Sequence, residues 1–232
     1  MSSSPSGPAR RDFLSQLSAA AVVAGAAAVT PFVAHAVEPE RPPGPLRDGT
    51  WDMSWVDRLS AVPYRVVFDA DNVADGLALY LAGMFMDQYH EVYGTGDEKA
   101  RAVIVMRRFA VPMALGDALW ARYAVGEDAK ITDPVTKQPA RKNPFSTAAP
   151  GTSPDDARIK LDALLARGAI LLVCSLAANN LAIRLAEQAK RDVETVRAEV
   201  RGGLVPGAIL MPSGVFATIR AQNAGCAYMR GA

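Results

Sequence analysis

Short hydrophobic runs alternate along this chain with longer stretches that are apolar at every third or fourth position. Five such runs cover residues 64–68, 102–106, 169–173, 208–211 and 226–230. Compact runs rich in β-branched, aromatic and other apolar residues are typical of strands, and the longer periodic stretches between them are typical of helices. Because strands that alternate with helices need crossover connections, we expect a mainly parallel sheet covered on both faces. The pattern predicts a three-layer α/β/α sandwich with about five strands.

The periodic stretches predict the helices. These span residues 73–93, 114–123, 153–167, 174 to about 200, and 213–224. Ser153 and Pro154 have the residue types that start a helix, with an acid three positions after the serine. Asp69 and Asp71 precede the first helix, where acids usually serve as caps, and we expect that role rather than metal binding or base catalysis.

The N-terminal segment has a different pattern. Arg10 and Arg11 precede an apolar stretch over residues 17–33, and Ala34 and Ala36 then supply a small-residue cleavage site. A basic, an apolar and a cleavage region in this order indicate an export signal, and the paired arginines resemble the twin-arginine type. A membrane anchor is the alternative, but it needs about 20 strongly apolar residues, and this stretch is mostly alanine.

The domain boundaries follow from this signal. We expect a signal peptide over residues 1–36, a proline-rich tether with a short docking helix over 37–60, and one domain over 61–232. The predicted location is periplasmic or otherwise extracytoplasmic. Within the domain, residues 126–153 form a long proline-containing insertion without apolar periodicity. Two interpretations remain open for it: a solvated surface insertion, or a lid or docking arm.

Composition excludes several function classes. Lys and Arg total 25 and Asp and Glu 24, so the chain lacks the basic excess typical of nucleic-acid binding. No later apolar stretch is long enough to span a membrane, so we expect no transmembrane segment in the mature form. With two cysteines and two histidines the chain offers no evident zinc site, and we expect no metal and no cofactor. In an oxidising compartment Cys174 and Cys226 could form a disulfide.

Candidate chemistry lies after the strands, because ligands of open parallel sheets bind beyond the carboxyl ends. Cys174 follows the third strand and opens a helix, where the helix dipole and free N–H groups favour a thiolate. The alternative is a buried cysteine with a packing role only. An anionic substrate could be held by Arg107 and Arg108 after the second strand, by Ser175 beside Cys174 and by Ser213 after the fourth strand.

Several segments together resemble the DsrE/DsrF-like family of small α/β sulfur-relay proteins. They are residues 103–112, 168–178, 206–215 and 225–230, the last with the sequence GCAYMR. The resemblance implies that Cys174 carries a persulfide, as a sulfurtransferase or sulfur carrier. It also implies a homo-oligomer, a trimer or hexamer, and a sulfur-donor protein or small anionic sulfur compound as partner. The alternative is a non-catalytic periplasmic binding or assembly module that uses residues 126–153.

Overall fold

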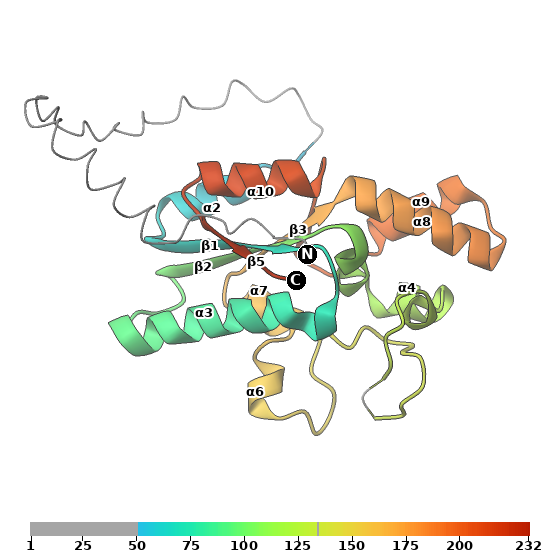
Figure 1. The fold of residues 1–232 in the computed structure, drawn as a ribbon, viewed down its shortest axis with the longest axis horizontal. Coiled ribbons are helices and arrows are strands. Elements are labelled where there is room, and N and C mark those ends of the chain that lie inside the picture. The colour runs from blue at the N-terminus through green and yellow to red at the C-terminus, as the bar shows by residue number, and fades with distance from the viewer. Residues whose placement is uncertain (1–50, 134) are drawn as a thin grey trace, which may run out of the picture. The chain divides into compact units, whose positions relative to one another are not determined.

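A five-stranded, all-parallel sheet forms the centre of the fold in the computed structural model, which describes residues 51–133 and 135–232. The strand order is β4-β3-β2-β1-β5. The strands are β1 (Tyr64–Ala70), β2 (Ala100–Met106), β3 (Ile170–Cys174), β4 (Ala208–Met211) and β5 (Ala227–Arg230). Helices cover both faces (Figure 1), which confirms the predicted three-layer sandwich.

Alternate residues of each strand point into two separate cores, as the two-residue period of a strand requires. Val66 and Phe68 of β1 belong to the larger core, and Val67 belongs to the smaller one. The larger core is covered by α3 (Leu77–Tyr93), α7 (Leu161–Ala166) and α8 (Ser175–Ala189). The smaller core is covered by α10 (Gly214–Asn223) and α2 (Asp57–Ser60), which lie on the opposite side of the sheet in Figure 1.

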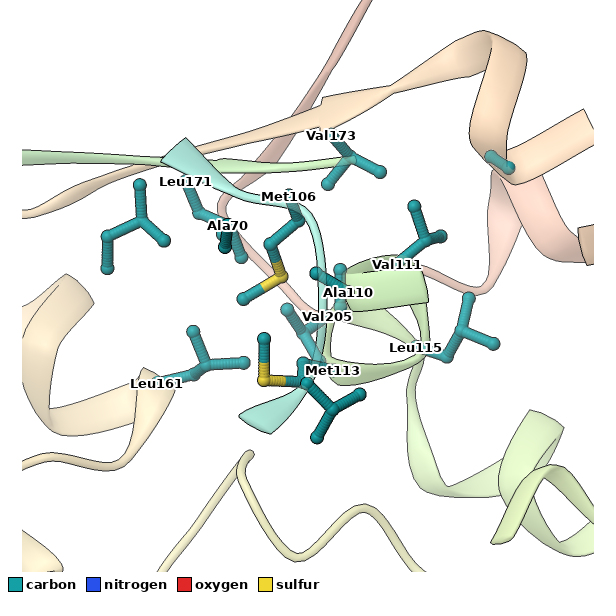
Figure 2. Packing of buried hydrophobic residues seen from close by; sticks show 14 of the residues in the cluster. Ala70, Met106, Ala110, Val111, Met113, Leu115, Leu161, Leu171, Val173 and Val205 are labelled. Atoms are coloured by element: carbon teal, nitrogen blue, oxygen red, sulfur yellow. The ribbon is translucent and has the colours of Figure 1, made fainter. Parts of the chain in front are cut away.

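The remaining short elements connect these layers. They are the 3-10 helices η1 (Ser54–Val56), η2 (Ala74–Gly76) and η3 (Arg108–Ala114), and the α-helices α4 (Asp117–Arg122), α5 (Val125–Asp128), α6 (Pro154–Ala157) and α9 (Val193–Gly202). Residues of η3 pack beneath the carboxyl ends of the central strands (Figure 2), where Val111 and Met113 join Met106 and Val173 in one buried cluster. This packing fixes the segment that follows β2.

The strand order decides on which face each connection runs. From β1 to β4 every strand lies beside its predecessor, so right-handed crossovers place α3, α7 and α8 on one face. The connection from β4 to β5 runs back across the sheet to the opposite edge, so the same handedness places α10 on the other face. The neighbouring strands β3 and β4 therefore feed helices on opposite faces, and a crevice opens between their carboxyl ends.

Four predicted helices differ from the structure, and the one expected over 73–93 begins as α3 only at Leu77, after the 3-10 helix η2. The helix expected after β3 is two helices, α8 and α9, because Lys190 adopts a left-handed conformation with φ 51° and Asp192 caps α9 by accepting the N–H of Thr195 at 2.8 Å. The helix expected over 153–167 is divided into α6 and α7. The predicted cap at its start is present, since Ser153 accepts the N–H of Asp156. The helix expected over 114–123 is confined to α4.

The short helices η1 and α2 before β1 pack on the domain through Trp55 and Leu59. Both side chains are fully buried in the smaller core. The predicted signal, with Arg10, Arg11, Ala34 and Ala36, lies outside the described residues. Within the described part of the chain, no helix is long and apolar enough to cross a membrane.

Candidate functional site

A cavity of about 300 Å³ occupies the crevice between the carboxyl ends of β3 and β4. Its walls come from the segment after β2, the first turns of α8 and the start of α10. The lining residues are Arg107, Arg108, Phe109, Cys174, Leu176, Ala177, Asn180, Arg184, Ser213, Gly214 and Val215. Four of the five residues predicted to form a site, Cys174, Arg107, Arg108 and Ser213, therefore line one cavity.

Cys174 is the last residue of β3 and also the N-cap of α8. Only 6% of the residue is exposed, and its Sγ accepts the N–H of Ala177 at 3.4 Å. A sulfur in this position receives a helix N–H and faces the positive end of the helix dipole, so both features stabilise negative charge on it. A buried packing role does not exclude a reactive role, because this buried residue also lines the cavity.

The start of α10 forms the facing wall. Ser213 is its N-cap and its Oγ accepts the N–H of Phe216 at 3.1 Å, while its own O–H remains a donor. Gly214 packs against Arg107 so closely that a Cβ there would lie 2.6 Å from the Arg107 Cβ. Ser175, predicted to bind substrate, is 6% exposed and is not one of the described residues that line the cavity.

Arg107 forms an ion pair with a buried carboxylate, that of Asp69. Its Nε and Nη2 donate to the two oxygens of Asp69 at 2.6 and 2.9 Å, and these hydrogen bonds raise the pKa of Arg107. Tyr228 of β5 donates its hydroxyl to the same carboxylate at 3.2 Å. Arg107 consequently acts as a fixed wall of the cavity rather than as a ligand-binding arm.

Arg108 is arranged differently from its neighbour. Its backbone is left-handed, with φ 48°, and its side chain is 61% exposed. The guanidinium lies 5.6 Å from the centroid of the Phe109 ring, and its closest acid, Asp71, is 3.6 Å away. A strained conformation of this kind persists only where surrounding structure imposes it. Arg108 is the arginine whose charge is best placed to meet a ligand.

Asp69 and Asp71 do not cap the following helix, so that prediction is wrong. Helix α3 begins only at Leu77, and its N-cap Gly76 offers no side chain. The two acids instead pair with Arg107 and Arg108. Their partners follow β2, and pairing across neighbouring strands is not visible in a local sequence pattern.

Two polar residues of the wall, Asn180 and Arg184, were not predicted from the sequence. Both lie on α8 and follow Leu176 at intervals of four residues, so they share its face of the helix. This periodicity after the strand end is the signal that could have identified them. Arg184 is held by Asp128 of α5, through contacts of 3.3 Å from Nε and 3.1 Å from Nη2.

The insertion over residues 126–153 is anchored to the domain. Asn143 is 3% exposed, and its Nδ2 donates to the carbonyls of Met113 at 2.7 Å and Leu115 at 2.8 Å. Its Oδ1 accepts the N–H of Phe145, which packs on the larger core. None of the described residues of the insertion lines the cavity, so here it is not a lid over this site.

The structure excludes the Cys174–Cys226 disulfide that the sequence left open. Both are free thiols, and two strands, β2 and β1, separate β3 from β5. The register relates both cysteines to strand β2. Ala227, the residue after Cys226, lies level with Ala102, and Val173, the residue before Cys174, lies level with Met106 at the other end of that strand. At about 4.8 Å between strands and about 3.3 Å per residue, their Cα atoms are more than roughly 20 Å apart, whereas a disulfide needs less than about 7 Å.

Comparison with known proteins adds no assignment to this geometry. No family model, curated protein or solved structure matches the chain.

Proposed function

We propose that this protein is an exported carrier of sulfane sulfur in which Cys174 forms a persulfide. The observation that supports it most is the position of Cys174: its sulfur caps α8, and the residue lines a cavity that Arg108 also lines. The similarity of residues 168–178 and 206–215 to DsrE/DsrF-like segments supports the same function, since these two stretches form the facing walls of the cavity.

The proposed step moves one sulfur atom without a net change of oxidation state. The Cys174 thiolate attacks the outer sulfur of a donor persulfide, a new Sγ–S bond forms, and the donor S–S bond breaks. Its electron pair leaves with the donor as a thiolate. An acceptor nucleophile later removes the outer sulfur and returns Cys174 to the thiolate. The N–H of Ala177 and the dipole of α8 stabilise the sulfur anion at both stages.

Persulfide formation tests this function directly. The purified protein is incubated with sodium polysulfide, excess donor is removed, and intact and peptide masses are measured. We expect one added sulfur on Cys174 and its release as thiocyanate when cyanide is added. Cys174→Ser should carry none, and serine is a good N-cap that can still accept the Ala177 N–H, so the fold should persist.

Cys226→Ala is the matched control. Cys226 is as buried as Cys174, but it belongs to the smaller core and burial raises the pKa of its thiol to about 11. The control should load sulfur as the unchanged protein does. If Cys174 gains no sulfur, or if the adduct is found on Cys226 instead, the carrier function is wrong and a non-catalytic binding or assembly module becomes the better explanation.

The export part of the proposal rests on Arg10, Arg11 and the apolar stretch that follows them. Fractionation of cells that express the full chain should find the protein outside the cytoplasm, with a mature N-terminus near residue 37. Replacing both arginines by lysine should retain it inside. Export that persists unchanged in this double variant would contradict the twin-arginine route.

A further inference from the structure

We infer that the cavity takes its sulfur from a small organic anion with an apolar body, of the organic thiosulfonate class, and that Arg108 and Phe109 recognise it. This inference rests on the proposed function and names the substrate class of the same site. It follows from the charge, the apolar rim and the size of the cavity.

The charge of the cavity wall favours an anion. Three arginines line it, and no carboxylate does so among the residues that the structure describes. Asp69 and Asp128 engage Arg107 and Arg184 through paired hydrogen bonds, whereas Arg108 has only the 3.6 Å contact with Asp71. A ligand anion can therefore approach Arg108 without breaking a hydrogen bond to an acid, and a charge-assisted hydrogen bond can form there.

The rim of the cavity favours an apolar body beside that anion. Phe109, Leu176 and Val215 all line it, with 55%, 61% and 63% of each residue exposed. They come from three different segments, so their meeting at one opening is a product of the fold. Arg108 lies over the Phe109 ring, so charge and apolar surface are presented side by side. Inorganic thiosulfate offers nothing to cover these side chains.

Size favours a small molecule. A cavity of about 300 Å³ lies at the lower end of the range for ligand sites. Cys174 is only 6% exposed, so the sulfur to be transferred must lie at the narrow end of the donor molecule. Asn180 and Ser213 supply neutral hydrogen-bond donors for oxygens next to that sulfur. A thiosulfonate combines a terminal sulfur, adjacent oxygens and an organic group in this order.

The transfer balances without an added oxidant or reductant. The Cys174 thiolate attacks the terminal sulfur of the thiosulfonate, and the Sγ–S bond forms as the bond between that sulfur and the sulfonyl sulfur breaks. The electron pair leaves with the sulfonyl group as an organic sulfinate. The persulfide anion on Cys174 and the sulfinate together carry the charge that the two reactants brought.

Single-turnover loading of Cys174 tests the inference with benzenethiosulfonate and inorganic thiosulfate as matched donors. Burial of about 60 Å² of ring surface at about 25 cal/mol per Å² predicts roughly tenfold faster loading from benzenethiosulfonate at low donor concentration. Phe109→Ala should remove most of that preference. Ile219→Ala should keep it, because Ile219 is similarly exposed, at 53%, but is not one of the described cavity residues.

Donors also differ in intrinsic reactivity, so a binding measurement accompanies the kinetics. In Cys174→Ser, calorimetry compares benzenesulfonate with sulfate, neither of which can transfer sulfur. We expect benzenesulfonate to bind at least about tenfold more tightly, and Arg108→Gln to weaken it by about tenfold. Arg141→Gln is the charge control, since Arg141 has the same side-chain exposure, 61%, and a single acid partner, Glu127.

The outcomes separate the two proposals. Equal binding of both anions, or no binding of benzenesulfonate, overturns the substrate class even if polysulfide loads Cys174. Loading only from a persulfide carried by another protein also overturns it, while leaving the carrier function intact. If benzenesulfonate binds as predicted but no donor loads Cys174, the carrier function fails, and the thiosulfonate assignment, which depends on that function, falls with it.

Discussion

Alkylation of the two cysteines in the native protein is a strict test of the site. Cys174 and Cys226 are equally exposed, at 6%, so a reagent that responds to exposure alone should not distinguish them. Their surroundings differ, because Cys174 lines an open cavity and Cys226 is packed in the smaller core. We expect iodoacetamide to modify Cys174 first.

The expected difference in alkylation rate follows from the pKa of the Cys226 thiol. Burial raises its pKa from 9.0 to about 11. Because only the thiolate reacts, a shift of this size lowers its reactive fraction about a hundredfold at pH 8, to roughly one thiol in a thousand. Burial raises the pKa because it disfavours the charged thiolate. Alkylation of Cys226 should therefore accelerate about tenfold per pH unit until the pH approaches 11.

The assay is a time course of intact and peptide masses after iodoacetamide addition under native conditions at pH 8. The same reaction in guanidinium chloride is the control, since unfolding exposes both thiols and should bring their rates close together. Labelling of Cys226 as fast as or faster than Cys174 in the native protein would refute the assignment of the reactive site. A Cys174–Cys226 disulfide in non-reduced peptides would refute the sheet register.

Three further predictions concern stability. Hydrogen bonds, the strongest from Arg191, lower the pKa of Glu199 from 4.5 to about 2, so the stability that this carboxylate contributes is fully present above pH 4.5 and is lost as the pH falls toward 2. The difference in Tm between the unchanged protein and Glu199→Gln, measured by calorimetry, should therefore become smaller over that range. A difference that stays constant would contradict this. Asn143→Ala leaves buried backbone groups unpaired and should cost about 2–4 kcal/mol in urea unfolding, and a loss within error would show that the insertion is anchored elsewhere. Gly214→Ala places a Cβ 2.6 Å from that of Arg107, so it should cost roughly 1–3 kcal/mol and slow sulfur loading, whereas unchanged stability would show that Arg107 can move freely.

The strands could be predicted because their signal is local. Burial on both faces gives the inner strands β1, β2 and β3 mainly apolar runs. The run at 208–211 coincides with β4, and the other four runs differ from their strands by at most two residues at either end. The positions where helices break were harder to predict from the sequence. The division between α8 and α9 depends on a left-handed Lys190, and lysine carries no strong local preference for that conformation.

The roles of adjacent arginines could not be separated from the sequence. Arg107 and Arg108 appeared as equivalent anion-binding residues at one strand end. The structure pairs Arg107 with Asp69, which lies on a neighbouring strand, and the left-handed turn at Arg108 directs the next side chain to the rim. Both effects depend on contacts between segments far apart in the chain.

By itself the sequence determined the number of strands, the alternation with helices and the placement of Cys174 and Ser213 at strand ends. Each of these follows from the spacing of apolar residues over a few turns or a few strand positions. Only the tertiary structure decided that these ends meet. The chain runs back after β4 to pair β5 with β1, which sends α8 and α10 to opposite faces and opens the cavity between them. The strand order also places β5, and Cys226 just before it, at the edge of the sheet away from β4. This order is set by long-range strand pairing, which no local pattern encodes.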